Sequence, residues 1–153
     1  MEIEIMLKKI FQSLIALVFF AGAQASANLL TNGDFDTDPG SLNNGSWGYF
    51  DSIPGWQEEN IFDHIELQTQ GTLGVTPHSG RFYAELNSHP AQSDVFSWGQ
   101  SFDTQADMVY QVIFYHRSRT AADGYFNVTA GDYDMNVENN DNSDWQQFIF
   151  EFT

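Results

Sequence analysis

The chain has 153 residues, of which 21 are Asp or Glu and 5 are Lys or Arg, so its formal net charge is −16. Such a surface repels phosphate backbones and anionic lipid headgroups, which excludes nucleic acid and membrane surfaces as expected partners. The sequence holds no cysteine, and 16% of its residues are aromatic, whereas disordered acidic chains are poor in aromatic residues. We therefore expect a folded domain without disulfides, which fits bacterial export better than a small eukaryotic secreted domain.

The first 27 residues have the pattern of a cleavable signal peptide. Lys8 and Lys9 form a basic n-region, residues 11–21 are almost wholly apolar, and Ala25-Ser26-Ala27 supplies the small residues that a signal peptidase accepts. The apolar run is too short for a bilayer span, which takes about 20 residues. We expect this leader (residues 1–27) to be removed, and the mature protein to be secreted, periplasmic or at the bacterial cell surface, without membrane insertion.

The remaining residues, 28–153, are enough for one domain and too few for two. All lysines lie in the leader, so this part carries 19 carboxylates and only three basic side chains, those of Arg81, Arg117 and Arg119. Two arginines in three residues stand out in so acidic a sequence. We expect each to pair with a carboxylate, with Glu85 or Glu66 as the natural partner.

Beyond the leader, apolar and polar residues alternate, as they do in β-strands that bury one face. In residues 81–87, Phe82, Ala84 and Leu86 share one face, while Glu85 and Asn87 share the other. Residues 109–117 are apolar on both faces, which predicts a central strand covered on both sides. Clusters of Gly, Asn, Asp and Pro separate these runs, so the predicted fold class is all-β, a sandwich or jelly roll. Further strands are predicted at 61–68, 95–102, 124–130, 133–138 and 145–152.

Five segments in order are similar to one known family. They are Asn28-Leu29-Leu30-Thr31-Asn32-Gly33-Asp34-Phe35-Asp36, Ile53-Pro54-Gly55-Trp56, Ile65-Glu66-Leu67, His78-Ser79-Gly80-Arg81-Phe82-Tyr83-Ala84-Glu85-Leu86-Asn87 and Phe114-Tyr115-His116-Arg117-Ser118-Arg119. This pattern resembles the galactose-binding-like jelly-roll domains of bacterial secreted proteins, which include many carbohydrate-binding modules and exported proteins that bear sorting signals. The resemblance implies a jelly-roll β-sandwich over residues 28–153. Family members usually continue for two more strands and end in an acidic motif of the Leu-Asp-Asn-Val kind, so we expect the domain to be C-terminally incomplete.

The resemblance also implies a structural Ca²⁺ at the opening motif, held by Asp36 with Asp34 or Asn32 nearby. Calcium takes about six to eight oxygen ligands, which carboxylates and backbone carbonyls supply. The distal Asp that completes the site in similar modules is absent from this sequence. The same residues also fit a simple turn without a metal, because Asn, Gly and Asp favour turn conformations. The four histidines lack the spacing of a helical zinc pair, so zinc is not expected.

A sugar-binding surface needs flat aromatic faces beside polar groups that hydrogen-bond hydroxyls. The candidate aromatic residues are Trp47, Tyr49, Trp56 and Trp98, and the candidate polar residues are Glu66, Glu85, Asn87, His116, Arg117 and Arg119. Other readings stay open, because a Trp in a β-sandwich is more often core than ligand platform, and Trp56 fits core packing best. An Arg–Glu pair also fits a purely structural bridge.

We expect a secreted, non-catalytic module that binds an extracellular glycan or polysaccharide. The sequence has no nucleophile elbow and no phosphate loop, and no spacing singles out a glycosidase pair among its carboxylates, so an enzyme is not expected. The alternative is a structural or adhesive module that binds a surface or matrix protein without sugar recognition. A groove with aromatic rings beside polar groups would favour the first function, and a broad apolar patch the second.

Overall fold

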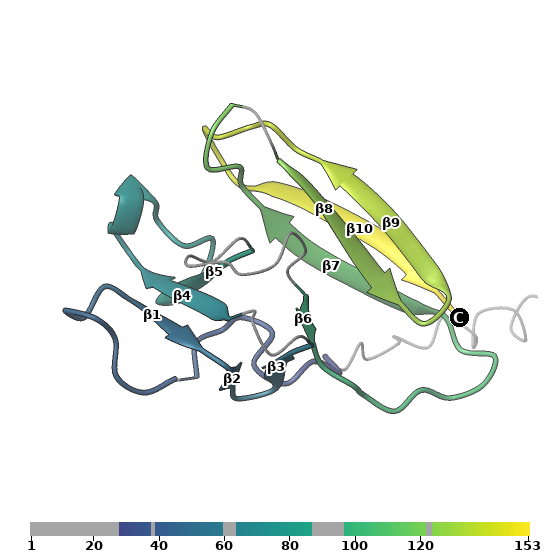
Figure 1. Cartoon of the computed structure of the whole chain (residues 1–153). Helices are drawn as coiled ribbons and strands as arrows, with labels where there is room; N and C mark the ends of the chain where they lie inside the picture. Colours follow the sequence, from purple (N-terminus) through teal and green to yellow (C-terminus); the bar gives the residue numbers. More distant parts are fainter. Residues whose placement is uncertain (1–27, 38, 60–63, 87–96, 122–123) are drawn as a thin grey trace, which may run out of the picture.

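The computed structural model describes residues 28–37, 39–59, 64–86, 97–121 and 124–153. Within these residues the chain forms short β-strands and one 3₁₀ turn, η1 (Thr72–Gly74), so the architecture is all-β as predicted. The predicted signal peptide and Asn87 lie outside the described residues. Figure 1 shows the strands in two groups, an early group around β1, β4 and β5 and a late group of four longer strands.

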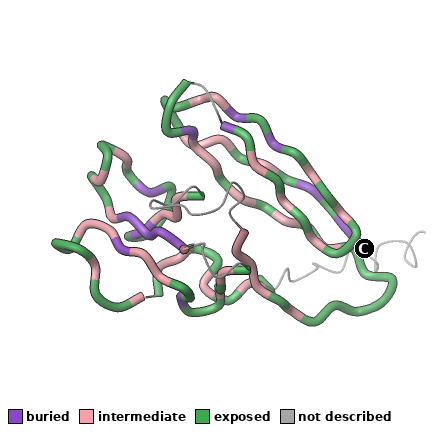
Figure 2. Tube along the Cα trace, viewed as in Figure 1, coloured by how far each residue is buried: buried purple, intermediate pink, exposed green. Residues whose placement is uncertain are grey.

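The early group is built on a three-stranded antiparallel sheet in the order β1 (Trp47–Phe50), β4 (Ile65–Thr69) and β5 (Phe82–Glu85). Alternate residues of β4 point to opposite faces. Ile65 and Leu67 are fully buried on one face, and the purple stretch of Figure 2 marks this strand as the most enclosed part of the group. This face is the hydrophobic core, and the opposite face is polar.

A small second sheet, in the order β2 (Ser52–Ile53), β3 (Trp56–Glu58) and β6 (Trp98–Gly99), extends the core. Ile53 is buried against Ile65 and Leu67. The rings of Phe35, Trp56 and Trp98 pack against this cluster, with centroids 5.1–5.7 Å apart. The indole nitrogen of Trp56 donates a hydrogen bond to the carbonyl of Asn32 (2.9 Å), so the opening motif is fastened to the core.

The late group consists of two antiparallel pairs that form two layers. Strand β7 (Tyr110–His116) pairs with β10 (Gln146–Phe152), and β8 (Tyr125–Ala130) pairs with β9 (Tyr133–Glu138). Figure 1 shows the β8–β9 hairpin lying along the β7–β10 pair. Aromatic rings join the layers: Phe114 contacts Phe126 (5.9 Å between centroids), and Tyr133 stacks on Phe150 (4.3 Å). The arrangement is that of a small β-sandwich.

Most strands follow the predicted alternation. The segment 133–138 coincides with β9, and the limits of β5, β7, β8 and β10 lie within two residues of the predicted ones. One part of the face assignment in 81–87 is wrong, because Leu86 lies beyond β5 and is 36% exposed. Strands β1, β2 and β3 were not predicted, because each is only two to four residues long and glycine interrupts the pattern at Gly48 and Gly55.

The prediction of a central strand covered on both sides at 109–117 is also wrong. Among the described residues β7 pairs only with β10, and Ile113 on its outer face is 48% exposed. Ile149, its direct partner on β10, is 52% exposed. The inner face packs against the β8–β9 hairpin, whereas these two isoleucines on the outer face are about half exposed.

Candidate functional site

The polar face of the three-stranded sheet carries the candidate site. In an antiparallel sheet, residues directly opposite each other project from the same face. The register of β1, β4 and β5 therefore places two rows of side chains there, namely Trp47, Gln68 and Tyr83 in one row and Tyr49, Glu66 and Glu85 in the other. Each row begins with an aromatic ring on β1 and continues with polar groups on β4 and β5.

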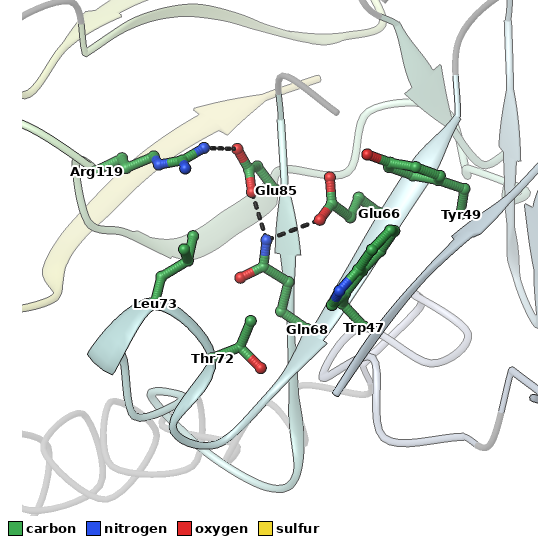
Figure 3. A pocket seen from close by; sticks show the side chains of 8 residues that line it. All are labelled: Trp47, Tyr49, Glu66, Gln68, Thr72, Leu73, Glu85 and Arg119. Carbon is green, nitrogen blue, oxygen red and sulfur yellow. Dashed lines mark hydrogen bonds and ion pairs between the residues drawn. The ribbon is translucent and has the colours of Figure 1, made fainter. Parts of the chain in front are cut away.

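A cavity of about 200 Å³ opens over these rows (Figure 3). Its walls come from the sheet, from the η1 turn and from the segment after β7, and its lining residues are Trp47, Tyr49, Glu66, Gln68, Thr72, Leu73, Glu85 and Arg119. Sites for drug-sized ligands are larger, at about 300–1,000 Å³. The cavity therefore suits one small polar unit, such as a single ring of a longer ligand.

Gln68 is the centre of a hydrogen-bond network on the cavity floor. Its side-chain nitrogen donates to Oε1 of Glu66 (2.9 Å) and to Oε2 of Glu85 (2.5 Å), so each amide hydrogen serves one carboxylate. Its oxygen accepts a hydrogen bond from the hydroxyl of Tyr83 (2.6 Å). Gln68 is 2% exposed and Glu66 7% exposed, so these two side chains contact little water and their hydrogen bonds fix their orientation.

The charge of the cavity is negative. Glu66 and Glu85 are direct cross-strand partners, and like charges so placed repel each other. Arg119 forms an ion pair with Glu85 (Nη1 to Oε1, 2.9 Å), which confirms the predicted pairing of one arginine. Burial, with the nearby carboxylates Glu85 and Glu66 as further causes, raises the pKa of Tyr83 to about 12, although Arg117 and Arg119 oppose the shift.

Two aromatic rings stand on the other side of the carboxylates. The rings of Trp47 and Tyr49 meet edge to face, with centroids 5.0 Å apart. Figure 3 shows them beside Glu66, whereas Arg119 lies beyond Glu85 on the opposite side. Aromatic surface and hydrogen-bonding groups thus face the same small space, which is the combination that a sugar ring requires.

The structure brings together five of the residues predicted to contact sugar, namely Trp47, Tyr49, Glu66, Glu85 and Arg119. Gln68, Thr72 and Leu73 were not predicted. The period of two along a strand could have indicated Gln68, because it shares the face of Glu66. The η1 turn had no comparable signal, since its position over the sheet depends on tertiary structure.

Other predicted residues lie elsewhere. Trp56 and Trp98 pack with Phe35 against the core, away from the cavity lining. Arg117 donates from Nε to the carbonyl of Asn142 (2.9 Å), and no carboxylate pairs with it among the ion pairs of the described residues. Asn87, predicted to share the face of Glu85, lies outside the described residues.

His116 lies between the two layers of the late group and not in the cavity. Its ring contacts Phe126 (4.4 Å between centroids), and its Nδ1 is 3.0 Å from the side-chain nitrogen of Asn139. An amide nitrogen only donates, so Nδ1 accepts and the ring is the neutral Nε2–H tautomer. Burial lowers the pKa of His116 below its ordinary value of 6.5.

The opening motif uses its predicted calcium ligands as hydrogen-bond acceptors. Oδ1 of Asp36 accepts from the backbone nitrogen of Arg81 (2.6 Å), and Oδ1 of Asp34 accepts from that of Asp36 (3.2 Å). Asn32 accepts from the backbone nitrogen of Thr37 (2.9 Å). These contacts make a tightly bonded turn, and a calcium ion at Asn32, Asp34 and Asp36 stays a prediction.

A different group of possible metal ligands was not predicted. Asp51, Glu58 and His64 come from three separate segments, and their ligand atoms lie within 4.8 Å of one another. Nδ1 of His64 is 3.0 Å from Asp51 and 3.9 Å from Glu58. The imidazole nitrogen in this set is a ligand for transition metals such as zinc more than for calcium, which prefers oxygen. Asp51 is largely exposed, with 80% of its side chain accessible.

No family model, curated protein or solved structure matches this chain. Within the described part of the chain, no helix has the length and apolar character that crossing a bilayer would require.

Proposed function

We propose that the protein is a non-catalytic carbohydrate-binding module that holds one sugar unit of an extracellular glycan in the cavity over β1, β4 and β5. The observation that supports this proposal is the joint presence of Trp47, Tyr49 and the Glu66–Gln68–Glu85 network in one small space. The rings offer faces for sugar C–H groups, and the fixed polar groups offer partners for hydroxyls. Net affinity is modest, because each such hydrogen bond replaces one to water.

The proposal includes the finer assignments made from the sequence. These are a jelly-roll sandwich of the galactose-binding-like kind, secretion from a bacterial cell after removal of residues 1–27, and a structural Ca²⁺ at the opening motif. The binding role is favoured over glycoside hydrolysis because Glu66 and Glu85 are tied to the same amide nitrogen. A glycosidase keeps its two carboxylates available to the glycosidic bond and to water or the anomeric carbon.

The first test measures binding of neutral oligosaccharides of glucose, galactose, mannose and xylose to the full chain by calorimetry and tryptophan fluorescence. Both measurements are repeated with Ca²⁺ and with a chelator. We expect saturable binding of at least one oligosaccharide. Replacing Tyr49 by Ala should weaken this binding by about tenfold or more, since stacking on an aromatic ring is lost.

The matched control is Tyr125→Ala, which removes an aromatic ring that is 69% exposed on β8 and does not line the cavity. It should bind as the unaltered protein does. Glu85→Ala should also abolish binding while far-ultraviolet circular dichroism keeps the β-sheet signal. If no glycan binds to the folded protein, the proposed function is wrong.

A second candidate function, a structural or adhesive module, is favoured by the outer face of β7 and β10. Ile113 and Ile149 are paired there and about half exposed, and Tyr115 on the same face is 38% exposed. Exposed apolar side chains that adjoin one another are typical of protein contact surfaces. The double variant Ile113→Thr and Ile149→Thr would lose adhesion and keep glycan binding, whereas Tyr49→Ala would do the reverse.

A further inference from the structure

Two strand pairings meet at Asp51, which lies between β1 and β2. The register of β1 and β4, continued one residue beyond its last pair, places Asp51 opposite His64. The register of β2 and β3, continued one residue before its first pair, places Asp51 opposite Glu58. The backbone nitrogen of Glu58 donates to the carbonyl of Asp51 (3.1 Å), as this continuation requires. Two separate pairings therefore bring His64 and Glu58 to the same residue.

The side chains of these three residues converge as well as their backbones. Nδ1 of His64 is 3.0 Å from Oδ1 of Asp51 and 3.9 Å from Oε2 of Glu58, and the ligand atoms of the three residues lie within 4.8 Å of one another. Zinc binds nitrogen and oxygen at about 2.0–2.2 Å in a tetrahedral arrangement, which sets neighbouring ligand atoms about 3.3–3.6 Å apart. The two distances at His64 lie on either side of this range, so small side-chain movements suffice to surround one ion.

Oε2 of Glu58 is the atom that points most directly to a cation. It is shielded from solvent, and it accepts no hydrogen bond within the part of the chain that the structure describes. Nδ1 of His64, at 3.9 Å, is beyond hydrogen-bond distance from it. A buried carboxylate oxygen without a donor carries the desolvation penalty of a charged acceptor. A cation between the three residues would remove this penalty.

Two of the three ligands are held in place by their surroundings. Glu58 belongs to β3, which is paired on both sides by β2 and β6. The ring of His64 lies beside that of Tyr49, with centroids 6.0 Å apart. The side chains of Glu58 and His64 are 19% and 34% exposed, whereas that of Asp51 is 80% exposed and can adjust to an ion. Ligands that are already oriented lose little conformational freedom on binding.

We propose that Asp51, Glu58 and His64 bind a divalent transition-metal ion of the zinc class. An imidazole with two carboxylates suits such ions, whereas calcium and magnesium prefer oxygen ligands alone. Three protein ligands leave a fourth position for water, on the side where Asp51 is exposed. The spacing of the histidines did not indicate this site, because its ligands meet only through strand register. The inference goes beyond the proposed carbohydrate binding and does not depend on it.

The test titrates Zn²⁺ alone into the full chain after treatment with a chelator and its removal, and follows binding by calorimetry. We expect saturable binding that an equal concentration of Ca²⁺ does not prevent. The thermal midpoint, measured by circular dichroism, should rise with Zn²⁺, because an ion that binds only the folded state stabilises it.

Two variants lose the same single charge at different places. Asp51→Asn alters a largely exposed side chain, so the fold should persist, and Zn²⁺ should bind at least about tenfold more weakly, since even outer-shell partners of a metal contribute that much. Asp103→Asn, at an exposed carboxylate outside the cluster, should leave binding unchanged. His64→Gln removes the imidazole and should weaken Zn²⁺ binding at least as much as Asp51→Asn does.

Three results would overturn the inference. The first is that Zn²⁺ does not bind to the unaltered full chain. The second is that Asp51→Asn and Asp103→Asn weaken binding alike, because the attraction is then a property of the acidic surface in general. The third is that Zn²⁺ binds to the folded His64→Gln variant as tightly as to the unaltered protein, because the ion then lies elsewhere. None of these results bears on glycan binding, so the two proposals fail separately.

Discussion

Asp36 joins the opening motif to the sheet that carries the cavity. Its Oδ1 accepts hydrogen bonds from the backbone nitrogens of Arg81 (2.6 Å) and Phe82 (3.4 Å), at the start of β5. Gly80 adopts a left-handed φ of 63°, and a Cβ there would overlap the Asp36 carboxylate. Asp36 therefore fits this segment by the space that Gly80 leaves for its carboxylate and by its hydrogen bonds to Arg81 and Phe82.

Asp36→Ala should lower the free energy of unfolding by about 1–2 kcal/mol, because two backbone donors lose a charged acceptor. Gly80→Ala should also be destabilising, owing to its positive φ and the overlap with Asp36. Urea unfolding measures both effects. Asp103→Ala, which removes an exposed carboxylate, is the control and should change stability by less than about 0.5 kcal/mol. Equal stability of the Asp36 and Asp103 variants would contradict this role.

At the scale of elements, aromatic rings hold the two layers of the late group together, and the ring of His116 is one of them. Nδ1 of His116 accepts from Asn139, so protonation would place two donors against each other and bury a charge beside Phe126. The native state therefore favours the neutral ring, which agrees with the lowered pKa of His116.

This arrangement predicts how stability responds to acid. As the pH falls below 6.5, the unfolded chain gains a proton at this histidine before the folded protein does, so the free energy of unfolding decreases. His116→Phe should remove part of the decrease between about pH 7 and about pH 5. The measurement is urea unfolding at both pH values. An unchanged decrease in the His116→Phe variant would contradict this role of His116.

The same elements show what the sequence could and could not predict. Strands β5 and β7–β10 follow the alternation of apolar residues, because each has one face against a core. Strands β1–β3 are too short for alternation to be recognised, and they pair only because β4 and β6 hold them. Which face of β7 is covered depends on the partner layer, and no local pattern reveals that.

The candidate site was only partly predictable, because residue chemistry is visible in the sequence and tertiary packing is not. Glu66 and Glu85 were chosen for their chemistry, and their direct pairing follows from a register that β4 and β5 set together. Trp56 and Trp98 have the same chemistry as Trp47 but pack with the ring of Phe35 against the core. Residue type indicates what a side chain can bind, whereas tertiary packing decides whether it is accessible.

At the scale of the whole molecule, a net charge of −16 opposes the compact state. Salt should therefore stabilise the fold. We expect the thermal midpoint to rise by several degrees between about 0.01 M and about 1 M NaCl, because the screening length falls from about 30 Å to about 3 Å. Calorimetric or circular-dichroism melting curves test this. A midpoint that falls with salt would mean that local ion pairs, such as Arg119–Glu85, outweigh the general repulsion.

The position of Gln68 has a consequence for the lifetime of the site. Hydrolysis of its side-chain amide, a slow ageing reaction of proteins, would turn the residue into Glu and leave three carboxylates in one small space. Both hydrogen bonds that now join it to Glu66 and Glu85 would be lost, because a carboxylate donates none. Only 2% of Gln68 is exposed, which limits its contact with the water that this reaction needs. Burial of Gln68 thus slows the chemical decay of the site.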